Sequence, residues 1–245
     1  KPRVRFAPSP TGEPHLGFAR TALYNFLFAK SKGGNFLLRI EDTDLERSKK
    51  DYQEKMLSAL SWLGLVWDEE VVYQSNRSAI YNKYIQLLLE NGNAYRCFAS
   101  IDELQKIRKE TNSYLYDGMW RNKSGGEVEE QLKKDTSFTV RLKTPQSGVS
   151  YFEDIIYGEI KVLNEEIDDF IIMRSDGSPV YNLTNVIDDN YMQISHVIRG
   201  EDHIPNTTKQ LLIYKALNLK VPQFAHLPMI LGEDRKRLSK RHGAT

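Results

Sequence analysis

The stretch Val4-Arg-Phe-Ala-Pro-Ser-Pro-Thr-Gly-Glu-Pro-His-Leu-Gly17 sets the pattern of the fold, because an apolar run, a proline-rich loop and a helix start follow one another within it. The prolines remove backbone donors, so the strand is predicted to end at Ala7. Apolar residues then recur at helical spacing, which predicts a helix over residues 17–31. Gly33-Gly34 ends that helix, and the apolar run 35–40 is predicted to be a buried strand.

The alternation of strand and helix continues on both sides of a different middle segment. Helices are predicted at residues 51–63 and 78–90. Beyond the middle segment, a strand, a helix and a strand are predicted at residues 194–199, 206–217 and 226–231. This order predicts parallel strands joined by helical crossovers.

The middle segment has a mixed pattern. Residues 100–110 are predicted to form a helix that Ser100 begins, because Glu103 completes a capping box. Short strands between turn signals follow, at residues 138–142, 150–156, 159–162 and 170–173. We therefore expect an α/β fold: one open parallel sheet formed by residues 1–95 and 186–245, with an inserted α+β domain at residues 96–185.

Composition excludes several classes of protein. The 245 residues hold 34 basic and 33 acidic side chains, so bulk charge alone does not predict nucleic-acid binding. One cysteine, Cys97, excludes a disulfide framework and a cysteine-rich zinc cluster, and it fits a reducing, cytoplasmic setting. No apolar run reaches the ~18 residues of a membrane span, so we expect no membrane association. The first residue is Lys1, and we expect an excerpt of a longer protein.

Two sequence motifs that could bind phosphate groups lie near the ends of predicted strands. His15-Leu-Gly17 opens the first helix, where His15 could donate to a phosphate and Gly17 would admit a base or ribose. Arg235-Lys-Arg-Leu-Ser-Lys-Arg-His-Gly243 could clamp a triphosphate. Taken alone, each motif is more often a solvated loop or a solvated basic tail.

Together the two motifs resemble the HIGH and KMSKS signatures of class I aminoacyl-tRNA synthetases. Other strings follow the order of the bacterial-type glutamyl-tRNA synthetase family: Arg5-Phe-Ala-Pro-Ser-Pro-Thr-Gly12, Arg39-Ile-Glu-Asp-Thr-Asp44, Tyr116-Asp-Gly118, Arg174-Ser-Asp-Gly177, Tyr181-Asn182, Val197-Ile-Arg-Gly-Glu-Asp202, His226-Leu-Pro228 and Leu238-Ser-Lys-Arg-His-Gly243. The match covers the family's catalytic half. Phe18 replaces the last His of the first signature, and Arg replaces the first Lys of the second.

The resemblance implies a Rossmann-type catalytic domain split by an inserted domain that binds the tRNA acceptor end. It implies ATP-dependent activation of L-glutamate, which requires tRNA, and transfer to the 3′-terminal adenosine of glutamate tRNA. Mg²⁺ would accompany ATP, and we expect a monomer. The catalytic residues that it implies are His15 and Lys240. The ATP-binding residues are Pro8, Gly12, His15, Gly17, Arg237, Leu238, Ser239, Lys240 and Arg241.

The resemblance also implies a binding site for glutamate whose charges complement those of the substrate. Arg5 and Arg199 would bind the two carboxylates, and Glu41 would bind the ammonium group. Neighbours implied for this site are Ala7, Ser9, Tyr181 and Asn185. Some relatives hold zinc in the insertion, but Ala99 and Trp120 stand where cysteines would be expected, so we expect no zinc and no other protein-held metal.

Three alternatives compete with this interpretation. One is the short paralogue that glutamylates a queuosine base in tRNA. A second is a nucleotidylyltransferase, against which the long insertion argues. The third is a non-catalytic tRNA-binding module, which the presence of both His15 and Lys240 disfavours.

Overall fold

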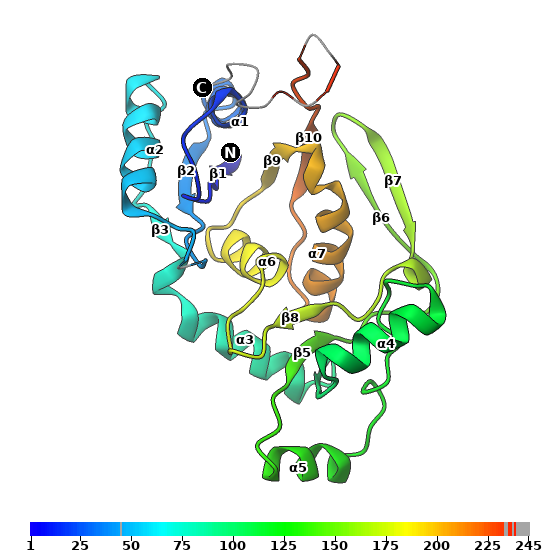
Figure 1. The fold of residues 1–245 in the computed structure, drawn as a ribbon. Coiled ribbons are helices and arrows are strands. Elements are labelled where there is room, and N and C mark those ends of the chain that lie inside the picture. The colour runs from blue at the N-terminus through cyan, green and yellow to red at the C-terminus, as the bar shows by residue number, and fades with distance from the viewer. Residues whose placement is uncertain (45, 233–234, 237, 239–245) are drawn as a thin grey trace.

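The computed structural model describes residues 1–44, 46–232, 235–236 and 238. Its N-terminal part is a parallel sheet of β1 (Arg3–Phe6), β2 (Asn35–Ile40) and β3 (Val72–Tyr73), covered by α1 (Leu16–Ser31) and α2 (Lys50–Trp62) (Figure 1). Phe6 of β1 packs edge-on against Phe18 of α1, with ring centroids 4.8 Å apart. The predicted first helix, the buried strand after it and the helix that follows are confirmed.

A second sheet has the order β7-β6-β10-β9. Strands β9 (His196–Gly200) and β10 (Gln223–Leu227) are parallel and are connected by α7 (Ile204–Ala216). A hairpin of β6 (Val149–Asp154) and β7 (Gly158–Leu163) extends this sheet, because Asp154 pairs with Phe224 of β10. The hairpin was expected in the inserted domain, yet it lies beside the C-terminal strands (Figure 1).

The α/β prediction with parallel strands is confirmed, but the strands form two ladders rather than one continuous sheet. The ladders meet between β1 and β9, where the Ser195 amide donates to the Arg3 carbonyl at 2.9 Å. Further along β9, the side chain of Asn25 on α1 donates to the Ile198 carbonyl at 2.9 Å. The side-chain amide of Asn25 thus satisfies the Ile198 carbonyl, which a paired strand would otherwise satisfy. Strands β1 and β9 are therefore not paired at their carboxyl ends.

A third, antiparallel sheet of β4 (Ala94–Cys97), β5 (Thr139–Leu142) and β8 (Ile171–Met173) lies at the lower end of the view, near α3 (Ser78–Glu90), α4 (Ile101–Thr111) and α5 (Gly125–Lys133) (Figure 1). Ser100 and Glu103 form the predicted capping box of α4. Strands β3 and β4 and helix α5 were not predicted. The buried carboxylate of Asp169 binds Arg121, Thr144 and Tyr95, and so holds this part together.

Helix α6 (Tyr181–Tyr191) was also not predicted, because Asn, Asp, Thr and β-branched residues fill it and these are weak helix formers. Buried contacts stabilise it instead. Asp188 accepts hydrogen bonds from Gln74 at 2.9 Å, Arg77 at 2.7 Å and Tyr81 at 2.6 Å. The domain boundary predicted at 185/186 falls inside α6, and the division of the chain into domains stays a prediction.

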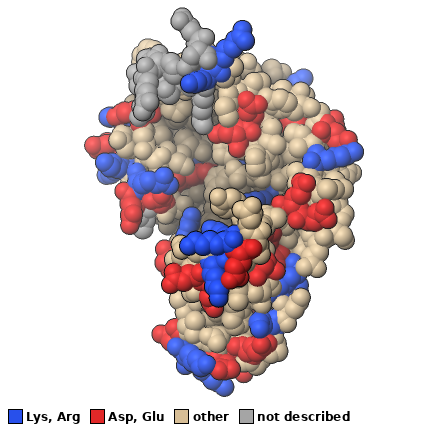
Figure 2. All heavy atoms as spheres, turned by 45° about the vertical axis from the view of Figure 1, so that its right-hand side comes forward, with Lys and Arg blue, Asp and Glu red and all other residues tan. Residues whose placement is uncertain are grey.

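Short 3₁₀ turns at Gln74–Asn76, Asn164–Glu166 and Glu201–His203 complete the elements. Within the described part of the chain, no helix has the length and apolar character to cross a membrane. On the face shown in Figure 2, acidic and basic side chains are interspersed, which agrees with the nearly balanced composition.

Candidate active site

A cavity of about 840 Å³ opens at the carboxyl ends of β1 and β9 and at the start of α1. This is the edge at which parallel sheets bind ligands. The predicted site residues that line it are Arg5, Ala7, Pro8, Ser9, Gly12, His15, Gly17, Glu41, Tyr181, Asn185, Arg199 and Leu238. The other predicted residues, Arg237, Ser239, Lys240 and Arg241, lie outside the described residues.

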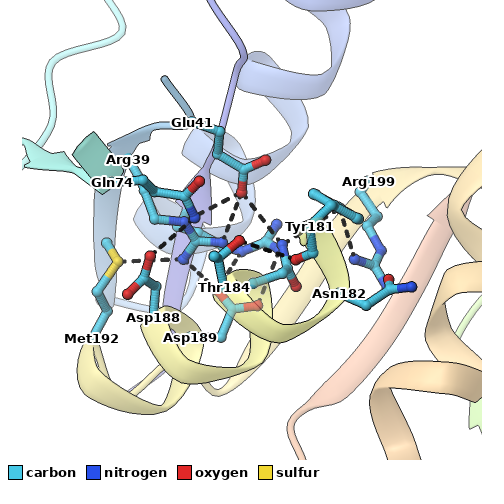
Figure 3. A network of polar contacts seen from close by, with 12 residues as sticks. Arg39, Glu41, Gln74, Tyr181, Asn182, Thr184, Asp188, Asp189, Met192 and Arg199 are labelled. Carbon is cyan, nitrogen blue, oxygen red and sulfur yellow. Dashed lines mark hydrogen bonds and ion pairs between the residues drawn. The ribbon is translucent and has the colours of Figure 1, made fainter. Parts of the chain in front are cut away.

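Buried charges form a network beside the cavity (Figure 3). Arg5 holds Asp189 through two hydrogen bonds, Nε to Oδ1 at 2.8 Å and Nη2 to Oδ2 at 3.1 Å. Arg39 Nη1 donates to the same Oδ1 at 2.6 Å, and its Nη2 donates to Glu41 Oε1 at 3.2 Å. The amide of Asn185 fits between them when its nitrogen donates to Asp189 at 3.2 Å and its oxygen accepts from Arg39 at 3.1 Å.

The two acids of this network respond differently to burial. Burial raises the pKa of Glu41, and the charges of Arg39 and Arg5 oppose that rise without cancelling it. Burial also acts to raise the pKa of Asp189, but the charges of Arg39 and Arg5 outweigh it and lower that pKa to about 2. Asp189 is therefore a fixed negative charge at neutral pH.

Arg199, on β9, has a different environment. Among the described residues, every acceptor of its hydrogen bonds is neutral: Thr207 Oγ1 at 2.7 Å, Gln210 Oε1 at 2.8 Å, His226 Nε2 at 3.4 Å and Tyr181 Oη at 3.4 Å. Burial lowers the pKa of Arg199. A buried guanidinium with neutral partners that also lines a cavity is suited to an anionic ligand.

His203 and Tyr181 face each other at the wall of the cavity, with Tyr181 Oη 3.3 Å from His203 Nδ1. Burial and the nearby charge of Arg199 lower the pKa of His203 to about 4. His203 is thus neutral at pH 7 and adds no positive charge to the cavity.

His15 is the N-cap of α1, and its Nδ1 accepts a hydrogen bond from the Phe18 amide at 3.4 Å. A neutral ring in this arrangement carries its proton on Nε2, which makes Nε2 the donor. A Cβ at Gly17 would lie 3.0 Å from Cε1 and 3.1 Å from Nδ1 of His15. Glycine at this position therefore leaves room for the imidazole ring, a role that the sequence pattern did not indicate.

Aromatic rings occupy the part of the insertion that corresponds, by the resemblance, to the zinc site of some relatives. The buried Cys97 donates to the Tyr116 hydroxyl at 3.4 Å. The rings of Phe98 and Trp120 pack with centroids 5.0 Å apart. The expectation of no zinc stays a prediction, which elemental analysis of the purified protein tests.

Sequence reasoning missed four functional candidates: Arg39, Asp189, His203 and His226. Arg39 lies in one of the strings that carried the resemblance. A charged residue inside an otherwise apolar strand was the sequence feature that could have identified it. His226 also lies in such a string, His226-Leu-Pro228, but its partner Asp154 is distant in sequence. Asp189 gave no local signal, because its partners Arg5 and Arg39 are distant in sequence.

Comparisons with known proteins all match tRNA synthetases. Residues 1–245 match the family described as tRNA synthetases class I (E and Q), catalytic domain. The chain is 54% identical to the glutamate–tRNA ligase of Coprothermobacter proteolyticus, over 99% of this chain and 53% of that protein. It is also 54% identical to the glutamate–tRNA ligase of Aquifex aeolicus, over 100% of this chain and 52% of that protein.

The fold is shared as well. The crystal structure of a glutamate–tRNA ligase from Elizabethkingia meningosepticum, in complex with its amino acid, superposes with a TM-score of 0.92 at 40% identity, over 99% of this chain and 52% of that chain. The predicted Rossmann-type α/β architecture is thus confirmed. The chain spans about half the length of the curated relatives it matches. Because the family match extends over all 245 residues, the chain belongs to the class I tRNA synthetases for E and Q, in their catalytic domain.

Proposed function

We propose that the protein activates L-glutamate with ATP and transfers it to the 3′-terminal adenosine of glutamate tRNA. The observation that carries the proposal is the set of buried charges that line one cavity: Arg5, Arg199 and Glu41. Two guanidinium groups and one carboxylate complement the two carboxylates and one ammonium group of glutamate. The relatives named as glutamate–tRNA ligases support the same substrate.

Arg199 and Arg5 bind the carboxylates of glutamate, and Glu41 binds its ammonium group. Asn185 and Tyr181 hydrogen-bond to the same ligand, while Ala7 and Ser9 line the pocket. Glutamine is rejected because a neutral amide cannot accept two charge-assisted bonds from a guanidinium. Since Arg199 has only neutral partners among the described residues, a substrate carboxylate would supply its missing counter-charge.

ATP binds at the start of α1. Pro8, Gly12 and Gly17 let the nucleotide approach the backbone, and the helix N-terminus favours its phosphates. Arg237, Leu238, Ser239, Lys240 and Arg241 form the second phosphate-binding element. Glu13 and Asp202 line the same cavity, and their carboxylates would supplement the phosphate ligands of a Mg²⁺ ion that arrives with ATP. Mg²⁺ bound with ATP would offset part of the phosphate charge.

The reaction is an in-line displacement in which the α-carboxylate of glutamate attacks the α-phosphate and pyrophosphate leaves. The residues position the reactants and stabilise charge, so no covalent enzyme intermediate is required. His15 donates from Nε2 to a phosphate oxygen, and Lys240 stabilises the leaving pyrophosphate. Residues 96–185 bind the acceptor end of the tRNA, which brings the 3′-terminal adenosine to the activated glutamate.

We further propose that this monomeric protein works in the cytoplasm, where tRNA charging occurs. The queuosine-modifying paralogue and a non-catalytic tRNA-binding module are not favoured, because the relatives matched over the whole chain are named glutamate–tRNA ligases.

The test is glutamate-dependent ATP–pyrophosphate exchange by the purified protein, with and without glutamate tRNA. We expect exchange that requires tRNA, followed by glutamate esterified at the tRNA 3′ end. Exchange supported equally by glutamine, or glutamate attached only to an internal base of the tRNA, would contradict the proposal.

A further inference from the structure

Asp154, His226 and Thr207 form a chain of hydrogen bonds that ends at Arg199. Asp154 Oδ2 lies 2.5 Å from His226 Nδ1. His226 Nε2 lies 2.9 Å from Thr207 Oγ1 and 3.4 Å from Arg199 Nε. Thr207 Oγ1 in turn accepts from Arg199 Nη2 at 2.7 Å. All four residues are buried.

The direction of each hydrogen bond follows from the first one. An ionised carboxylate can only accept, so His226 carries a proton on Nδ1. Burial and the charge of Arg199 lower the pKa of His226, so the ring is neutral and its Nε2 can only accept. The Thr207 hydroxyl has two acceptors within reach, His226 Nε2 at 2.9 Å and the His203 carbonyl at 3.1 Å. In the shorter of the two contacts it donates to Nε2 and turns its lone pairs toward Arg199.

Asp154 is itself held firmly. Its Oδ1 accepts from the Ile156 and Tyr157 amides at 2.9 and 3.0 Å, and its Oδ2 accepts from the His226 amide at 3.0 Å. The carboxylate therefore has one orientation, at the turn of the β6–β7 hairpin, and that orientation selects the tautomer of His226.

We propose that Asp154 and His226 are positioning residues that hold Arg199 in the orientation in which it binds a substrate carboxylate. The hairpin thereby contributes to the glutamate site without touching the ligand. This inference rests on the proposed function, in which Arg199 binds glutamate. A guanidinium that recognises a planar carboxylate must be held in its plane, and bonds on its Nε and Nη2 edges leave Nη1 toward Tyr181 and the cavity.

Two pairs of variants test the chain of hydrogen bonds. His226→Gln retains an acceptor near the position of Nε2, whereas His226→Asn retains only the group near Nδ1. Thr207→Ser retains the hydroxyl, whereas Thr207→Val replaces it with a methyl group of similar size. We expect His226→Asn and Thr207→Val to raise KM for glutamate about tenfold, since that is the scale of losing a hydrogen bond to a charged group.

The readout separates positioning from general damage. KM for ATP should stay at the parent value in both variants, and His226→Gln and Thr207→Ser should restore most of the glutamate KM. Asp169→Asn is the control, because it removes another buried carboxylate, which binds Tyr95, Arg121 and Thr144 rather than Arg199 or His226, and it should leave the ratio of the two KM values unchanged. Equal effects on both KM values, or no recovery in the conservative variants, would overturn the proposal.

The tautomer is measured independently of activity. The ¹⁵N chemical shifts of the His226 ring, assigned by their loss in His226→Gln, should show a protonated Nδ1 and a bare Nε2 at neutral pH. A proton on Nε2 would contradict the role of Asp154. Failure of the proposed function would instead appear as the absence of exchange by the parent protein.

Discussion

Arg5 and Asp189 form a two-point ion pair across 184 residues of sequence, with Nε–Oδ1 and Nη2–Oδ2 distances of 2.8 and 3.1 Å. The pair fixes the plane of the guanidinium, while Nη1 makes no hydrogen bond to any described residue. Arg5 is thus oriented by the protein on one edge and lines the cavity with the rest of its head group.

Arg5→Gln should weaken the use of glutamate and narrow its preference over glutamine. Losing one charged partner of a buried carboxylate costs several kcal/mol, whereas glutamine never formed that ion pair. The measurement is kcat/KM for both amino acids in tRNA-dependent pyrophosphate exchange. Arg3→Gln, on the same strand but outside the cavity, is the control. An unchanged glutamate-to-glutamine ratio would make Arg199 the specificity residue to test.

Asp189→Asn should remove a pH-dependent part of the stability. The folded pKa of Asp189, about 2, lies below its ordinary value of 3.8, so the stabilisation is complete above pH 3.8 and is lost as pH falls through 2. That shift corresponds to about 2 kcal/mol. The free energy of unfolding, measured in urea at pH values between 7 and 2, should depend less on pH in the variant than in the parent protein. Parallel curves for the variant and its parent would refute this expectation, and the exposed Asp102→Asn serves as control.

Gly17→Ala should slow activation without destabilising the protein. The new Cβ would meet the His15 ring at 3.0 Å, so the imidazole must shift by a few tenths of an ångström. Alanine favours a helix by roughly 0.5–1 kcal/mol over glycine, so Tm should not fall. Single-turnover activation and Tm measure the two effects. Gly125→Ala, also at the start of a helix but with nothing within 4 Å of its Cβ, should leave the rate unchanged and should not lower Tm. A normal rate in Gly17→Ala would contradict the proposed role of this contact.

Lys240→Ala should lower the activation rate far more than it weakens glutamate binding. This prediction rests on the sequence motif, since Lys240 lies outside the described residues. Removing a preorganised stabiliser of developing charge typically costs on the order of 10²–10³ in rate. The rate of single-turnover activation at saturating glutamate is the measurement, and near-normal activation would rule out the assignment.

The sequence predicted the elements whose signals are local. The strand Asn35–Ile40 and the helix Ser78–Glu90 have the bounds that the apolar pattern predicted, and Ser100 with Glu103 caps the helix that it was expected to begin. Helical periodicity, glycine stops and capping boxes all act within a few residues, so one segment contains the whole signal.

The motif resemblance named the residues of the site, and the described ones line a single cavity. The sequence did not indicate which of the two arginines has an acid partner. Arg5 is bound to Asp189, and Arg199 has only neutral partners among the described residues. That difference gives the two guanidinium groups unequal roles in binding an anion.

By itself, the sequence determined the alternating elements, the family and the candidate residues. Only the tertiary structure decided that α6 is a helix, that the β6–β7 hairpin joins the C-terminal sheet, and that Asp154 meets His226. The physical reason is the range of the interactions. Local propensity acts between neighbours in the chain, whereas buried ion pairs and hydrogen-bond chains form between segments that packing brings together from more than 70 residues apart.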